Sequence, residues 1–98
     1  MSLVVLINAF EVPKGKEDEC LVFWEKAAEY MKRQPGFIST RLHRAISPEA
    51  RFHLINVAEW ESAEHFQRAV GSEEFKRLTK PYMEVFAHYP GLYEVIRT

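Results

Sequence analysis

The spacing of apolar residues switches between a strand period and a helix period along this chain. Residues 3–12, 37–46 and 51–60 are short apolar runs with β-branched members, which is typical of strands. Between the first two runs, helical spacing predicts a helix from Lys16 to the stop signal at 34–36. The apolar residues on that helical spacing are Cys20, Trp24, Ala27 and Met31.

The last third of the chain predicts two short helices and a final strand. Ser62 and Ser72 are favourable N-cap residues for the two helices. Pro81 interrupts the pattern, helical spacing resumes over 82–89, and 92–97 is a strand-like run. The order β-α-β-β-α-β predicts an α+β, ferredoxin-like fold, in which a four-stranded antiparallel sheet carries the helices on one face.

Length and charge narrow the class of protein. A chain of 98 residues forms one domain, so we expect a single domain over residues 1–98. Its net charge of −1, without a basic stripe, argues against nucleic acid, and no apolar run is long enough to span a membrane. The single cysteine, Cys20, excludes an internal disulfide and indicates a reducing cytoplasm.

Two of the predicted strands carry apolar side chains on both faces. In the first strand, Leu6 and Phe10 point to one face, while Val5 and Ile7 point to the other. Helices on one side of a sheet cover only one of those faces, and soluble proteins rarely leave a large apolar face exposed. We therefore expect a symmetric homodimer packed sheet to sheet, with an apolar cavity beside each sheet.

A few polar residues interrupt these apolar strands and are candidates for a site. Asn56 and Trp60 are four residues apart and share a face, and Asn8 interrupts the first strand. His43 joins them if its side chain faces the same side of the sheet as Asn56. The alternatives are a strand amide that satisfies local backbone, a tryptophan that only fills the core, and a surface histidine.

Other kinds of chemistry find little support in the sequence. The histidines lack metal-site spacing, and no phosphate loop or dinucleotide motif is present, so we expect neither a metal nor a nucleotide cofactor. Cys20 lies on an apolar helix face, where a thiol is most simply a buried hydrophobe. His88 is open to three interpretations: a buried base, a haem ligand or a loop residue.

The motifs at these positions resemble the antibiotic biosynthesis monooxygenase (ABM) family. The resemblance rests on Asn8, Val12-Pro13-Lys14-Gly15-Lys16-Glu17, Trp24, Pro35-Gly36-Phe37, Asn56, Trp60-Glu61-Ser62 with Phe66, and Ser72-Glu73-Glu74-Phe75-Lys76. It extends over nearly the whole chain up to about Lys80, and it implies a dimeric α+β barrel of ferredoxin-like subunits.

The resemblance implies three kinds of function. One branch oxidises aromatic polyketides or quinols with O2 and no cofactor, and its pocket residues are matched by His43, Asn56 and Trp60, with Phe66 in place of a tyrosine. A haem-degrading branch is matched by Asn8 and Trp60. Thr79 stands where that branch has its axial histidine, which leaves His88 or His65 as substitutes. The third kind is an isomerase or a non-catalytic binding protein.

The leading prediction is a cofactor-independent monooxygenase that oxidises an electron-rich phenol, anthrone or hydroquinone with O2. Asn56 and Trp60 would hydrogen-bond the developing oxyanion, and His43 would accept the phenolic proton. The predicted substrate-binding residues are Asn8, Phe10, Leu54 and Phe66. Haem binding and a non-catalytic dimeric binding module are the alternatives.

Overall fold

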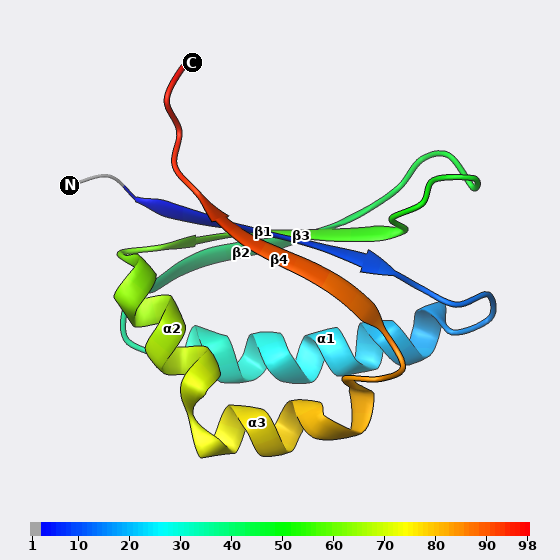
Figure 1. Cartoon of the computed structure of the whole chain (residues 1–98), viewed down its shortest axis with the longest axis horizontal. Coiled ribbons are helices and arrows are strands. Elements are labelled where there is room, and N and C mark those ends of the chain that lie inside the picture. Colours follow the sequence, from blue (N-terminus) through cyan, green and yellow to red (C-terminus); the bar gives the residue numbers. More distant parts are fainter. Residues whose placement is uncertain (1–2) are drawn as a thin grey trace.

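A computed structural model describes residues 3–98, which form one antiparallel sheet and a layer of helices (Figure 1). The sheet has the strand order β2-β3-β1-β4. Along residues 3–98 the elements are β1 (Val4–Glu11), α1 (Glu17–Lys32), β2 (Phe37–Arg44), β3 (Leu54–Trp60), α2 (Ala63–Gly71), α3 (Glu73–Thr79), the 3-10 helix η1 (Lys80–Tyr82) and β4 (Ala87–Tyr93). The predicted α+β, ferredoxin-like fold is confirmed. No helix in the described residues is long and apolar enough to cross a membrane.

Helix α1 begins and ends where the sequence predicts. Its first turn is acidic and Lys32 lies in its last turn, and the helix dipole stabilises charges of these signs at these two ends. The chain then turns at Gly36, which has φ +86° and whose missing Cβ leaves room for the ring of His65. The Gly36 carbonyl accepts a 2.8 Å hydrogen bond from the Glu61 N–H, which ties this turn to the end of β3.

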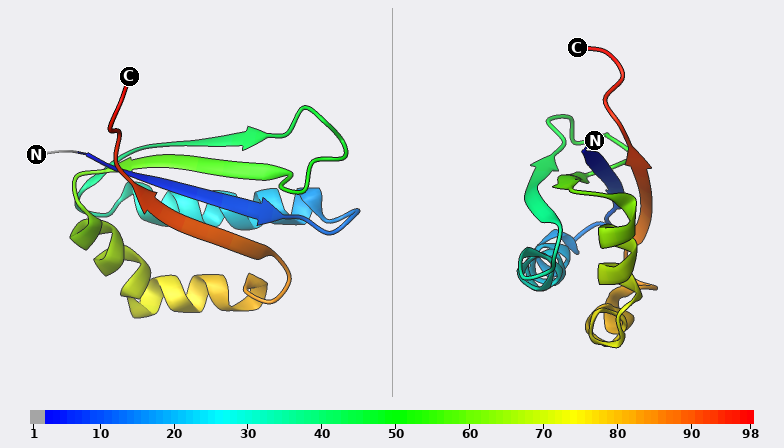
Figure 2. Two further views of the ribbon diagram at one scale, coloured as in Figure 1. Left: turned by 45° about the horizontal axis from the view of Figure 1, so that its top comes forward. Right: turned by 90° about the vertical axis from the view of Figure 1, so that its left-hand side faces the viewer.

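Both predicted N-caps are confirmed. The Ser62 hydroxyl accepts from the His65 N–H at 3.2 Å, and the Ser72 hydroxyl accepts from the Phe75 N–H at 3.1 Å. The buried hydroxyl of Tyr30 bonds Ser72 as well, so α1 is tied to the junction of α2 and α3. These contacts hold α2 and α3 on the same side of the sheet as α1, as both views in Figure 2 show.

Strand β2 contains a β-bulge near its start. Phe37 pairs with Trp60, but Ser39 pairs with Glu59, so Ile38 is an extra residue in the ladder. Because strand side chains alternate, one extra residue moves every later side chain of β2 to the opposite face.

The end of the chain differs from the prediction. The helical spacing over 82–89 does not form a helix beyond η1, and the last strand is β4 rather than residues 92–97. Pro90 and Gly91 lie inside β4. A proline is tolerated there because β4 is an edge strand, whose outer side needs no N–H for the ladder.

The sheet has a helix-covered face and a face that no helix covers, which we call the far face. The far face carries a strip of apolar side chains from three of its four strands, β3, β1 and β4, namely Val5, Ile7, Ala9, Ile55, Val57, Tyr89 and Tyr93. Tyr89 and Tyr93 are 49% and 56% exposed. The C-terminal segment leaves the sheet on this side (Figure 2).

Candidate functional site

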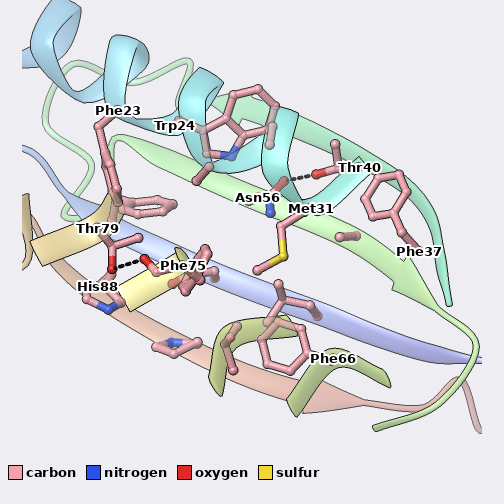
Figure 3. Close-up of a pocket in the computed structure, with 18 of the residues that line it drawn as sticks. Phe23, Trp24, Met31, Phe37, Thr40, Asn56, Phe66, Phe75, Thr79 and His88 are labelled. Atoms are coloured by element: carbon pink, nitrogen blue, oxygen red, sulfur yellow. Dashed lines mark hydrogen bonds between the residues drawn. The ribbon is translucent and has the colours of Figure 1, made fainter. Parts of the chain in front are cut away.

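A cavity of about 350 Å³ lies between the helix-covered face of the sheet and the helices α1, α2 and α3. Its walls are mostly apolar and aromatic, and its polar groups come from β1, β2, β3, β4 and α3 (Figure 3). The lining residues that matter for chemistry are Asn8, Thr40, Asn56, Trp60, Lys76, Thr79 and His88. A small apolar chamber with a few converging polar groups is typical of a small-molecule site.

Two amides lie next to each other on the floor of the cavity. Asn8 and Asn56 are register partners in β1 and β3, so their Cβ atoms are about 5 Å apart. The Oδ1 atom of Asn56 accepts a 2.6 Å hydrogen bond from the Thr40 hydroxyl (Figure 3). That bond fixes the amide, and it leaves the two N–H groups of the Asn56 side chain for a ligand.

Two buried polar atoms at the cavity have no hydrogen-bond partner among residues 3–98. They are Asn8 Oδ1 and Trp60 Nε1. The indole of Trp60 contacts the rings of Phe37 and Phe66 edge to face, and the Trp60 side chain is 1% exposed. An unpaired buried polar group costs about 1–3 kcal/mol, so such groups are expected where a bound molecule completes the hydrogen bonds.

His43 does not join this group. It pairs with Ile55 on the far face, is exposed, and does not line the cavity. Sequence parity places His43 on the face of Phe37, but the bulge at Ile38 reverses that parity. The prediction that His43 shares a site with Asn56 and Trp60 is therefore wrong for this chain.

Two of the three predicted apolar substrate-binding residues line the cavity, and the third does not. Phe10 and Phe66 line the cavity. Leu54 is on the same face and 2% exposed, but it packs in the core beside Phe10 and does not line the cavity. Phe52, just before β3, packs against Tyr89 and does not line the cavity.

Four polar residues of the cavity are not among the predicted catalytic and substrate-binding residues. Of these, the sequence leaves His88 open as a buried base or a haem ligand, and Thr79 enters only as the residue in place of an axial histidine. Thr40 has the parity that the bulge conceals, and His88 falls in the region that helical spacing assigned to a helix. Lys76 and Thr79 lie on α3, where the Thr79 hydroxyl donates to the Phe75 carbonyl at 2.9 Å. A prediction of β4 at its true position would have revealed His88.

The charge of the cavity has one sign. Among the described residues, no Asp or Glu side chain lines it, and its ionisable side chains are Lys76 and His88. Burial raises the pKa of the nearby Cys20 thiol to about 11, with the Glu17 carboxylate adding to the shift, so this thiol is neutral. Such a cavity favours an anion over a cation.

No metal site accompanies these groups in the part of the chain that the structure describes. There, no three side chains of His, Cys, Asp or Glu lie close enough together to hold a metal ion.

Comparison with known proteins assigns the family. The model of the antibiotic biosynthesis monooxygenase family matches residues 3–80. The chain belongs to this family. Asn8, Thr40, Asn56, Trp60 and the polar residues of α3 lie within the matched range, whereas His88 lies outside it.

Two relatives share 39% of their aligned residues with this member of the family. A mycobilin-producing heme oxygenase from Mycobacterium tuberculosis, strain H37Rv, matches over 64 residues. That match spans 65% of this chain and 59% of the oxygenase. A crystal structure of a candidate monooxygenase from Shewanella loihica PV-4 matches 100% of this chain and 99% of its own, with a TM-score of 0.84.

A more distant structure shares the fold. SnoaB, a cofactor-independent oxygenase from Streptomyces nogalater, is 24% identical with a TM-score of 0.85, and the match covers 100% of this chain and 97% of SnoaB. At this identity the similarity concerns the fold.

The unpaired buried oxygen of Asn8 should lower the folding stability of the ligand-free protein. We expect Asn8→Leu to raise the free energy of unfolding by about 1–3 kcal/mol, because an apolar side chain of similar size removes the buried orphan. Urea unfolding of the ligand-free protein measures this change.

Asn56→Leu is the matched control, because it leaves the Thr40 hydroxyl without its partner and should not stabilise the protein. Equal stability changes in both variants would contradict the assignment of Asn8 as the unpaired amide.

Proposed function

We propose that this member of the ABM family is a cofactor-independent monooxygenase that oxidises an electron-rich aromatic molecule with O2. The substrate class is a phenol, an anthrone or a hydroquinone. The observation that carries the proposal is the cavity itself: its apolar walls have a size for one small aromatic molecule, and its lining within residues 3–98 includes two amides and no carboxylate. This environment stabilises an aromatic oxyanion, which is the electron-rich form that reacts with O2.

Six residues of the cavity have a role in this proposal. The Asn56 side chain, fixed by Thr40, donates to the substrate oxygen, and the unpaired indole N–H of Trp60 is a second donor. Asn8 accepts from a further hydroxyl of the substrate. The rings of Phe10 and Phe66 pack against the substrate and exclude water.

The reaction balances without a further reductant. A phenolate or related anion gives one electron to O2, and the resulting radical pair combines at a ring carbon. Loss of water then leaves one oxygen atom in the product as a carbonyl and the other in the water. The substrate supplies all four electrons that O2 takes up. The similarity of fold to SnoaB, itself a cofactor-independent oxygenase, supports this proposal.

A homodimer is part of the proposal. The apolar strip on the far face includes Ile7, which is 37% exposed, and the two exposed tyrosines of β4. A second copy packed sheet to sheet would cover this strip. We also place the protein in the cytoplasm, because its one cysteine is a free thiol.

Haem binding is the second candidate function, and the heme oxygenase of Mycobacterium tuberculosis favours it. The donor set of this cavity fits haem poorly. Thr79 turns its hydroxyl back to the helix, and Lys76 is the one cation among the described lining residues that could pair with a propionate. Of the described lining residues, only His88 offers an imidazole to an iron atom, and the volume of about 350 Å³ is near the lower limit for small-molecule pockets.

Loss of the Asn56 amide should separate catalysis from binding. We expect Asn56→Ala to lower kcat for hydroquinone oxidation by about 100- to 1,000-fold, because one oxyanion donor is lost. An oxygen electrode measures the rate, and the quenching of tryptophan fluorescence measures binding.

Gln67→Ala is the matched control, because it removes an exposed amide from α2 outside the cavity. Turnover that persists without O2 would rule out the proposed reaction. A ligand that binds wild-type protein without any turnover would establish a binding protein instead.

The proposed dimer predicts that a charge introduced on the far face lowers the sedimenting mass of the protein from that of two chains to that of one. Wild-type protein should sediment at twice the 11.5 kDa mass of the chain at micromolar concentration, and Ile7→Glu should sediment as a single chain because it buries a carboxylate in the apolar strip. Glu64→Gln on the exposed surface of α2 is the control. A wild-type species of 11.5 kDa would contradict the dimer.

Addition of haemin distinguishes the two candidate functions. We expect no Soret band that depends on a histidine of this chain, because the cavity presents a poor donor set for haem. Titration of wild-type, His88→Ala and His65→Ala proteins with haemin, followed by absorbance, measures this. A Soret band that His88→Ala loses and His65→Ala keeps would establish haem binding and identify its ligand.

A further inference from the structure

We propose that His88 is the proton acceptor of this site, a role that rests on the proposed function and adds to it the residue that ionises the substrate. The Nε2 atom of His88 would take the proton of a phenolic hydroxyl, so that the bound molecule is held as its anion. His43, which sequence analysis selected for this role, lies on the far face.

The hydrogen bonding of His88 fixes which nitrogen is free. Its Nδ1 atom lies 3.1 Å from the carbonyl oxygen of Phe86, two residues earlier in the chain. A carbonyl oxygen only accepts hydrogen bonds, so Nδ1 carries the hydrogen in this contact. The neutral ring then has its lone pair on Nε2, the form that a general base requires.

The position of His88 brings this base to the amides. His88 pairs with Phe10 across the sheet, and its ring centroid is 6.2 Å from that of Phe10. Asn8 is two residues from Phe10 and pairs with Pro90, so Asn8 and His88 are diagonal neighbours on one face, with about 7–8 Å between their backbones. One substituted aromatic ring can occupy the space between the base and the amide pair.

Among the described residues around His88, none provides a negative charge that faces its ring. On α3, Lys76 is the other ionisable side chain that lines the cavity within the described residues. On β1, Glu11 is paired with Arg51 at 3.0 Å, and it pairs with Ala87, so it points to the opposite face from His88. Tyr82 of η1 stacks on Phe23 and Phe86 at the edge of the core, and its hydroxyl accepts a 3.3 Å hydrogen bond from the exposed Lys26. The imidazolium formed by proton transfer therefore has the bound anion as its partner, which couples ionisation of the substrate to binding.

The step is a simple proton transfer. The O–H bond of the phenol breaks and an N–H bond forms at Nε2, which leaves a phenolate beside an imidazolium. The phenolate then supplies its electron to O2, as in the proposed function, and the proton returns to the oxygen atom that leaves as water.

The direct test uses 4-nitrophenol, whose neutral and ionised forms absorb at different wavelengths. At a pH just below the pKa of the free phenol, wild-type protein should bind the ionised form, whereas His88→Gln should bind the neutral form, with at least a tenfold lower ratio of phenolate to phenol. His43→Gln removes the histidine of the far face for comparison. Wild-type protein that leaves 4-nitrophenol neutral, or a His88→Gln protein with the wild-type spectrum, would overturn the proposal.

Turnover gives an independent readout. We expect His88→Gln to lower kcat for hydroquinone oxidation by about 100- to 10,000-fold, the range for loss of a general base. Added imidazole should restore part of the activity of His88→Ala by filling the space of the missing ring, and this result does not depend on the folding of the glutamine variant. A smooth thermal transition and retained binding of 4-nitrophenol show that each variant is folded.

The outcomes separate this inference from the proposed function. If wild-type protein ionises 4-nitrophenol but oxidises no hydroquinone, the monooxygenase proposal fails and the role of His88 as proton acceptor stands. If hydroquinones are oxidised and His88→Gln is as active as wild-type protein, the inference fails and the proposed function stands. A loss of activity in His43→Gln with none in His88→Gln would likewise reject the inference.

Discussion

The relative positions of Asn8, Asn56 and His88 in the cavity depend on the register of β1, the strand that pairs with both β3 and β4. Its pairing is continuous over seven residues on each side, so it aligns three strands at once. Asn8 is thereby opposite Asn56 on one side and Pro90 on the other. A shift of one residue in either ladder would turn these side chains to the far face and remove the site.

The same arrangement imposes a cost on stability. Buried polar atoms of Asn8 and Trp60 have no partner among the described residues, although the Oδ1 atom of Asn56 beside them is bonded to Thr40. A chain of 98 residues has a thin core and little stability in reserve. Unpaired buried polar atoms are retained where a ligand completes their hydrogen bonds. The cavity that contains them is therefore the best candidate for the functional site.

The sequence predicts much of this fold because several local signals agree. Helix α1 has its apolar spacing, its charged ends and its stop signal, and the caps at Ser62 and Ser72 have the expected hydrogen bonds. Asn56 and Trp60 were found because strand alternation is reliable within β3, which has no irregularity. His43 and β4 were misplaced for two reasons: an extra residue in β2 has no clear sequence signal, and Pro90-Gly91 is typical of a turn.

The sequence by itself determined the order of elements, the first helix and the apolar character of both sheet faces, because these follow from periodicity and local hydrogen bonding. Only the tertiary structure decided which histidine shares a cavity with the amides. His43 and His88 are the same residue type, but the bulge in β2 turns His43 to the far face, and the pairing of His88 with Phe10 of β1 turns His88 inward. Those orientations depend on pairing between strands that are distant in sequence, which no local pattern records.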